Sequence, residues 1–310
     1  MRSGEAVVQA LRSRGHDVLP VLVDHDVDKA LRGSGIDVAF LALHGRYGED
    51  GAIQGLLEWM GIPYTGSSVL ASALAMDKLK AKELFRLHNV PTPPYYDVSG
   101  PLSDVDLEER HGSFGFPVMV KPRREGSSIG VSRAKDLAEL RAGVDEALAH
   151  DDAVIVERYV RGREVHVGIL DGRVLGAIEV VPRRPFYDFQ AKYQKGLCEY
   201  YYPARLPPTR YQGVLRLAQR ANDALGCTGA TRVNLLVTEG ENEYVLEVNT
   251  LPGLTPTSLL PKIAAGAGID FATLCEEVLK GARLHSRPAH RQPTLTAPAI
   301  SEGASGALLA

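Results

Sequence analysis

The chain has 310 residues, 45% of them hydrophobic, and a formal net charge of −3. This length allows two or three domains with large cores, and the charge excludes a nucleic-acid binder that works through a broad basic surface. Cys198, Cys227 and Cys275 are far apart and odd in number, which indicates reduced thiols in a cytosolic protein. We also expect neither a signal peptide nor a membrane span.

The first part of the chain predicts alternating helices and strands. The expected elements are an amphipathic helix from Ser3 to Gly15, a strand over 18–23, a short helix, a strand over 38–43, a helix over 52–60 and a short strand over 62–66. The strand over 38–43 is uniformly apolar, which predicts burial on both faces and parallel pairing. The polar, glycine-rich loop 44–51 follows its carboxyl end, where open α/β sheets bind ligands.

This first region predicts a doubly wound domain, which normally opens on a strand near the middle of its sheet. The present chain opens on a helix instead. We therefore expect that the first strand of the domain, before Met1, is missing from this sequence.

The rest of the chain predicts helices and strands in mixed order. Strands are expected over 116–122, from 131, and over 154–157, 165–170, 174–180, 230–237 and 244–249; helices are expected over 76–87, 136–149, 211–225 and 271–284, with a short one from Leu259 capped by Ser258. The polar and aromatic segment 183–196 is long enough to be a functional loop. Residues 286–310 have the composition of a disordered tail.

A lysine and a glycine-rich loop predict a phosphate site. Lys121 stands at the end of an apolar strand, and Gly126-Ser127-Ser128-Ile129-Gly130 follows it. Small residues let backbone N–H groups approach a phosphate. The lysine precedes the glycines, so this is not the P-loop pattern, and the loop alone would fit an ordinary hairpin turn.

Two acids extend this site toward a nucleoside. Glu157 ends a strand where backbone groups and a carboxylate can meet an adenine, and Glu164 lies seven residues further, within reach of ribose hydroxyls. Either acid alone fits a solvated surface residue. Their place after Lys121 and its loop favours a nucleotide site.

Four polar side chains converge on the predicted C-terminal hairpin. Glu247 and Asn249 share one face of their strand, and Arg232 and Asn234 share one face of the partner strand. Carboxylate and amide oxygens suit a hard cation such as Mg²⁺, with nucleotide phosphates completing its shell. A cross-strand salt bridge on a wet sheet face is the alternative, and the apolar flanks fit it poorly.

Several long motifs occur in the order in which one enzyme family carries them. They are HGRYGEDG (44–51), MDK (76–78), VKPRREGSSIG (120–130), YDFQAKY (187–193) and LEVNTLPGLTPTSLLP (246–261). Over residues 3–284 the chain resembles the D-alanine–D-alanine ligases of the ATP-grasp superfamily. The resemblance implies an α/β chain with the ATP-grasp fold, α+β in its grasp subdomains, behind an N-terminal doubly wound domain without its first strand.

The resemblance also implies roles for individual residues. Lys78 and Lys121 would contact ATP phosphates, Glu157 and Glu164 would contact the adenine and ribose, and Ser127 would lie in the loop that closes over the nucleotide. Lys192 and Tyr193 would come from a second loop over the active site, with Lys192 toward the γ-phosphate; Glu247 and Asn249 would hold Mg²⁺ or Mn²⁺, two ions in all. Arg232 and the N–H of Gly253 would stabilise the oxyanion, Ser258 and Leu259 would hold the second D-alanine, and His44 and Glu49 would line the amino-acid end of the site.

The implied reaction joins two D-alanines through an acyl phosphate, at the expense of ATP, for peptidoglycan precursors. It also implies a cytoplasmic enzyme, a homodimer, with small-molecule substrates and no nucleic-acid or membrane partner. The expected divisions are an N-terminal domain (1–76), a central subdomain (77–153), a C-terminal subdomain (154–285) and the tail (286–310).

Two departures from the family pattern limit the expectation. The family places an acid that receives the first D-alanine upstream of Ser3-Gly4, outside this sequence, so we expect the chain to bind ATP but to handle that substrate poorly. Asn234 stands where the family usually has a metal-binding aspartate, which predicts weaker Mg²⁺ binding. The alternatives are a ligase for another amino or hydroxy acid and a truncated nucleotide binder with little turnover.

Overall fold

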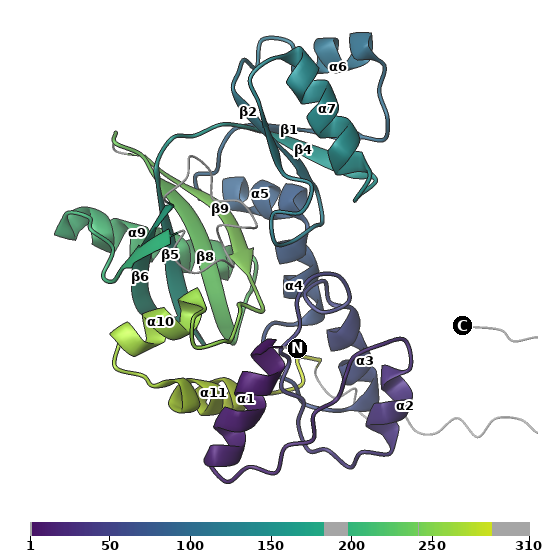
Figure 1. Ribbon diagram of the computed structural model, residues 1–310, viewed down its shortest axis with the longest axis vertical. Coiled ribbons are helices and arrows are strands. Elements are labelled where there is room, and N and C mark those ends of the chain that lie inside the picture. The colour runs from purple at the N-terminus through teal and green to yellow at the C-terminus, as the bar shows by residue number, and fades with distance from the viewer. Residues whose placement is uncertain (1, 183–197, 241, 287–310) are drawn as a thin grey trace, which may run out of the picture.

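A computed structural model describes residues 2–182, 198–240 and 242–286 (Figure 1). Its helices are α1 (Arg2–Ser13), α2 (Val27–Arg32), α3 (Ala52–Met60), α4 (Val69–Met76), α5 (Lys78–Leu87), α6 (Asp104–His111), α7 (Leu137–Leu148), α9 (Pro208–Ala224), α10 (Leu259–Gly266) and α11 (Phe271–Lys280). Its strands are β1 (Tyr95–Ser99), β2 (Val118–Pro122), β3 (Ser132–Ala134), β4 (Ala153–Arg158), β5 (Arg163–Leu170), β6 (Arg173–Pro182), β7 (Cys198–Tyr201), β8 (Ala230–Val237) and β9 (Glu243–Asn249).

The first sheet is antiparallel, with strand order β1-β4-β2-β3. Helix α7 covers it, and Leu140 and Val144 of the helix pack on Val118, Val120 and apolar neighbours of the strands. The helix begins after Asp136, whose carboxylate accepts from the N–H of Glu139 at 2.9 Å, as an N-cap does. This sheet carries Lys121 on β2 and Glu157 on β4.

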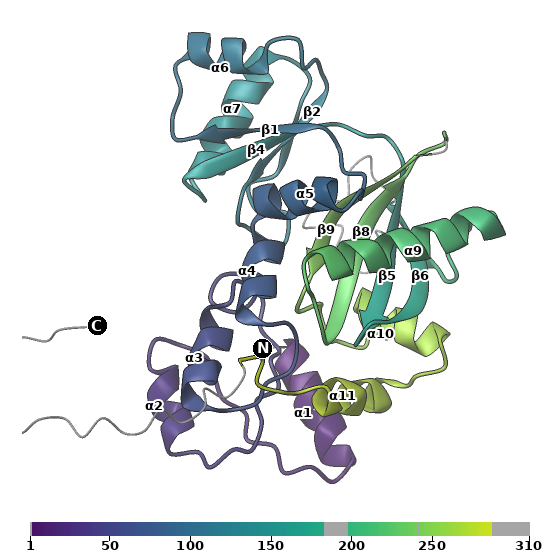
Figure 2. The same cartoon turned by 180° about the vertical axis from the view of Figure 1, so that it is seen from behind.

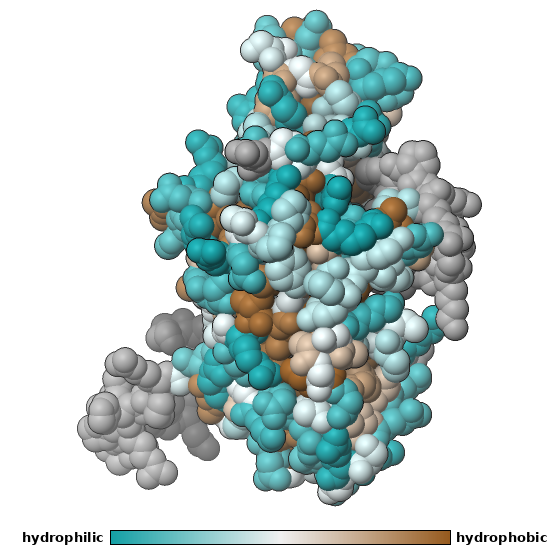
Figure 3. Space-filling model, turned by 90° about the vertical axis from the view of Figure 1, so that its left-hand side faces the viewer, coloured by the Kyte–Doolittle hydropathy of each residue, from teal (hydrophilic) through white to brown (hydrophobic). Residues whose placement is uncertain are grey.

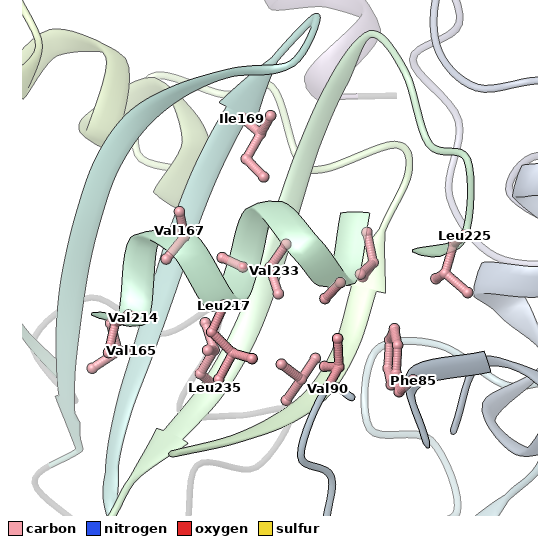
Figure 4. Packing of buried hydrophobic residues seen from close by; sticks show 14 of the residues in the cluster. Phe85, Val90, Val165, Val167, Ile169, Val214, Leu217, Leu225, Val233 and Leu235 are labelled. Carbon is pink, nitrogen blue, oxygen red and sulfur yellow. The ribbon is translucent and has the colours of Figure 1, made fainter. Parts of the chain in front are cut away.

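The second sheet is also antiparallel, with strand order β7-β6-β5-β8-β9. Helix α9 covers one face, where Val214 and Leu217 lie over Val165, Val167 and other strand residues (Figure 4). Helix α10 packs on the other face with α11. Because both faces are covered, β5 and β6 are buried almost along their whole length, which explains their continuous apolar sequences.

The N-terminal region has helices but no sheet among its described residues. The strands expected over 18–23, 38–43 and 62–66 are absent, and one parallel bridge, Ala39 to Tyr64, stands in their place. Leu41 instead donates its N–H to Thr65 Oγ1 at 3.0 Å. A strand exists only where neighbours complete its ladder, and an apolar run alone does not supply them.

Four elements were not expected from the sequence. They are α4, β1, α6 and β7, and α4 packs directly on α5. The segment that contains β1 reads as a turn region because of its prolines, yet Tyr95–Ser99 pairs along β4. Tertiary pairing therefore overrides the local signal here.

The two sheets face each other across α5, which lies between them in both opposite views (Figures 1 and 2). Strand β4 belongs to the first sheet, so a boundary at residue 153 would divide that sheet. We propose instead that the central subdomain ends between β4 and β5.

On the side of the molecule shown in Figure 3, hydrophilic residues dominate and an apolar area lies in the lower half.

Among the residues placed in the structure, no helix is both long and apolar enough to cross a membrane.

Candidate active site

A cleft of about 450 Å³ lies between the two sheets. It is lined by seven of the residues expected at the site: Lys78, Lys121, Ser127, Glu157, Glu164, Asn234 and Glu247. Its apolar lining comes from both sheets and includes Met119, Val180, Leu236 and Leu246, which sequence reasoning did not identify. Charged groups at one end and apolar side chains between the sheets suit a nucleotide with a flat base.

Lys78, Lys121 and the loop after β2 lie together on the wall of the cleft, where the sequence predicts a phosphate site. The Lys78 ammonium donates to the backbone oxygen of Glu125 in this loop, and burial lowers its pKa. Ser127 and Ser128 have φ values of 52° and 60°, which non-glycine residues rarely adopt. Backbone in such a conformation is typical of ligand-binding loops.

Glu157 lies at the centre of the first sheet, opposite Tyr95 on β1 and Met119 on β2. Its side chain is 2% exposed and forms ion pairs with Lys121 at 2.7 Å and with Lys82 at 3.1 Å. Burial alone would raise the pKa of Glu157, but the two ammonium charges lower it to about 2. Glu157 is therefore ionised; the sequence analysis identified it without Lys82.

Glu164 is held by two neighbours on the second sheet. Its Oε1 atom lies 3.0 Å from His166 Nε2 and accepts from Asn234 Nδ2 at 3.3 Å. His166 and Asn234 are directly opposite on β5 and β8. These contacts fix the carboxylate on the cleft wall, where it can accept hydroxyl hydrogen bonds.

The four-residue patch on the C-terminal hairpin forms as expected. Arg232 pairs with Asn249 and Asn234 with Glu247 across β8 and β9. Among the described residues, Asn234 Oδ1 and Arg232 Nε are buried without a hydrogen-bond partner. A buried polar atom without a partner is costly unless a ligand meets it.

The oxygens of this patch fit a hard cation. Glu247 supplies a carboxylate, and Asn234 and Asn249 supply amide oxygens, of which Asn249 Oδ1 also accepts from the N–H of Leu251 at 3.0 Å. Two of these three oxygen donors are amides, and the described residues contain no cluster of three His, Cys, Asp or Glu side chains for a metal. Such an oxygen set is one that Mg²⁺ accepts when phosphates complete it.

His44 lines a second, smaller opening together with Ser3 and Leu251 among others, and Glu49 follows on the same loop, 44–51. Glu49 Oε2 accepts from the N–H of Gly45 at 2.6 Å, and burial raises the pKa of Glu49 to about 7, with the charge of Glu247 adding to the rise. Burial lowers the pKa of His44. The charge of Arg232 acts on the pKa of both residues, so both lie near the polar side chains of the C-terminal hairpin.

The segment after β9 brings Gly253 against Ser258. A Cβ atom on Gly253 would lie 2.9 Å from Ser258 Oγ, so a larger residue there would displace the Ser258 hydroxyl. Helix α10 begins at Leu259 as expected, but Ser258 does not cap it. Its hydroxyl accepts from the N–H of Thr255 at 3.2 Å instead, and the first N–H groups of the helix stay available to an anion. The Leu259 side chain is buried, so only its backbone can contact a substrate.

Two predicted site residues lie outside the described residues, and so do the expected loop over 183–196 and, apart from residue 286, the expected tail over 286–310. Lys192 and Tyr193 belong to the segment 183–197, which the structure does not describe. Lys82 was not identified from the sequence, because its partner Glu157 lies far along the chain, on β4. Its spacing of four residues from Lys78 places both on one helix face, which is the signal that could have identified it.

Comparison with known proteins identifies the family of this chain. Family models described as D-ala D-ala ligase C-terminus and D-ala D-ala ligase N-terminus match residues 84–280 and 27–67. A D-alanine–D-alanine ligase of Geotalea uraniireducens is 52% identical over 286 residues, 92% of this chain and 91% of the relative. One from Anaeromyxobacter sp. (strain K) is 50% identical over 288 residues, 92% of each chain.

Solved structures agree with the sequence relatives. The D-alanine–D-alanine ligase of Bacillus anthracis complexed with ATP has a TM-score of 0.78 and 32% identity over 90% of both chains. VanG D-Ala:D-Ser ligase from Enterococcus faecalis has a TM-score of 0.72 and 33% identity over 79% of this chain and 72% of that one. The fold is therefore the expected ATP-grasp fold, and the chain belongs to the D-alanine–D-alanine ligase family.

Proposed function

We propose that this protein joins two D-alanines to D-alanyl-D-alanine, with conversion of ATP to ADP and phosphate, for peptidoglycan precursor synthesis. The observation that carries the proposal is the cleft between the two sheets, in which Lys78, Lys121, Glu157 and Glu164 lie beside Asn234 and Glu247. Nucleotide-binding and cation-binding groups thus share one site.

The first step is phosphoryl transfer. A carboxylate oxygen of the first D-alanine attacks the γ-phosphorus, the bond to ADP breaks, and an acyl phosphate forms. Lys78 and Lys121 bind the phosphates, while the backbone of the loop around Ser127 encloses them; Lys192 is proposed to reach the γ-phosphate. Fixed positive groups in a dry cleft stabilise the charge that develops there.

Mg²⁺ or Mn²⁺, two ions in all, would be held by Glu247, Asn249 and Asn234. When bound, the metal supplies positive charge that offsets the repulsion between triphosphate and carboxylate.

The second step is attack on the acyl carbon. The amine of the second D-alanine attacks, phosphate leaves with the electron pair of its bond, and the nitrogen loses a proton. We assign Arg232 and the N–H of Gly253 to the oxyanion, and the N-terminus of α10 at Ser258 and Leu259 to the carboxylate of the second substrate. His44 and Glu49 line the amino-acid end, and Tyr193 favours an amine acceptor.

We further propose a cytoplasmic homodimer. None of the three cysteines forms a disulfide in the described part of the chain, which fits a reducing compartment. Trp59 on α3 is 93% exposed, and exposed aromatic residues are enriched at interfaces. Sedimentation of wild type and Trp59→Ala tests this proposal, because a dimer held through α3 would dissociate in the variant.

An acceptor panel tests the substrate assignment. The protein is incubated with ATP, Mg²⁺ and D-alanine, either without a second acceptor or with D-serine, D-lactate or L-alanine. The products are identified by mass spectrometry. We expect D-alanyl-D-alanine to dominate every mixture. A mixed product in excess over the D-alanine dipeptide would assign the chain to ligases for another acceptor, such as the D-Ala:D-Ser relative.

A further inference from the structure

A fully buried lysine lies behind the cleft without lining it. The Lys82 side chain on α5 is 0% exposed, and its ammonium lies 3.1 Å from Glu157 Oε1. It also donates to Thr92 Oγ1 at 2.5 Å and lies 5.4 Å from the centre of the Tyr95 ring. A buried ammonium is costly unless it is paired and hydrogen-bonded, and these three contacts meet that need.

Glu157 therefore has two cations on opposite oxygens. Lys121 pairs with Oε2 at 2.7 Å and Lys82 with Oε1 at 3.1 Å. The two lysines differ in access, because Lys121 is 14% exposed and lines the cleft, whereas Lys82 is closed off. The cluster carries one positive charge more than the single carboxylate requires.

The charge states agree with this arrangement. Burial lowers the pKa of Lys82 to about 8 although Glu157 opposes the shift. The pKa of Glu157 is lowered to about 2 by Lys121 and Lys82 against the effect of burial. Lys82 and Glu157 are therefore both ionised at neutral pH.

We propose that Lys82 is a positioning residue that remains the counter-ion of Glu157 when Lys121 turns from Glu157 to the phosphates of bound ATP. The inference rests on the proposed function, which assigns Lys121 to the phosphates. Without Lys82, one ammonium would have to serve both the buried carboxylate and the triphosphate.

These separate roles of Lys82 and Lys121 predict that loss of Lys82 affects the binding of ATP and of adenosine differently. Adenosine has no phosphates, so Lys121 stays on Glu157 when adenosine binds and Lys82 is not needed as sole counter-ion. ATP draws Lys121 away, and a buried carboxylate without a counter-ion is strongly unfavourable. Loss of Lys82 should therefore weaken the binding of ATP much more than the binding of adenosine.

The experiment measures dissociation constants of ATP and adenosine with Mg²⁺ present, by calorimetry, for wild type, Lys82→Met and the double variant Lys82→Met/Glu157→Gln. For Lys82→Met we expect an increase of about tenfold or more for ATP and less than about threefold for adenosine. The double variant removes one positive and one negative charge, so the cluster keeps its net charge. We expect its ATP-to-adenosine ratio to return to within about threefold of wild type.

Equal losses for ATP and adenosine in Lys82→Met would assign Lys82 to the shape of the pocket and overturn the proposal. Should that variant not fold, the double variant decides. A selective loss of ATP there would mean that Lys82 acts independently of Glu157, which also contradicts the proposal. Failure of wild type to bind ATP would count against the proposed function itself, so the two failures are distinguishable.

Discussion

Asn234 contributes a different atom to each side of the cleft. Its amide nitrogen donates to Glu164 at 3.3 Å, and its oxygen is buried without a hydrogen-bond partner among the described residues. An aspartate in this position would face the Glu164 carboxylate with like charge. The amide therefore holds Glu164, which is proposed to bind the ribose, and leaves one oxygen for the proposed cation.

Replacement of Asn234 by aspartate should separate these two roles. The added negative charge strengthens the cation site, so we expect Asn234→Asp to lower the Mg²⁺ concentration for half-maximal rate several-fold. Loss of the hydrogen bond to a charged acceptor should raise the KM for ATP about tenfold. Asn89→Asp, outside the cleft lining, is the control. An unchanged Mg²⁺ requirement would show that Asn234 is not a ligand.

At the scale of elements, the loop 44–51 contacts the phosphate loop after β2. Arg46 Nε lies 2.8 Å from Glu125 Oε1, and Arg46 Nη2 donates to the backbone oxygen of His150 at 2.8 Å. Glu125 also accepts from Lys78 through its backbone oxygen. The amino-acid end and the phosphate end of the site are thus joined through one glutamate.

Arg46→Ala should loosen this junction. Partly exposed ion pairs contribute less than about 1 kcal/mol, so we expect the KM for ATP to rise about two- to fivefold. Lys80→Ala is a matched control, since Lys80 pairs with Glu83 at 2.8 Å within α5 at similar exposure. An equal effect in both variants would indicate a general loss of charge and not a link between the loops.

The same scale shows what the sequence can predict. The pairing of β8 with β9 and the shared face of Arg232 and Asn234 and of Glu247 and Asn249 could be predicted, because strand periodicity is local. The strands over 18–23 and 38–43 could not be judged in this way, since a ladder depends on neighbours distant in sequence. Lys82 was hidden for a similar reason, because its acid is on β4.

At the scale of the whole molecule, the end of the described chain is tied to the N-terminal region. Glu58 on α3 accepts from the N–H of His285 at 2.8 Å and from the Tyr64 hydroxyl at 2.9 Å, and Tyr64 bridges to Arg283. The segment after α11 therefore holds α3 and the segment around Tyr64 in place.

One isotope measurement tests the central claim. D-Alanine labelled with ¹⁸O in its carboxylate is incubated with ATP, Mg²⁺ and the protein, and phosphate, ADP and dipeptide are analysed by mass. Because a carboxylate oxygen becomes the bridge to phosphorus, the account predicts one ¹⁸O in phosphate for each D-alanyl-D-alanine formed. ADP release without D-alanine dependence, or phosphate free of label, would contradict ligation through an acyl phosphate.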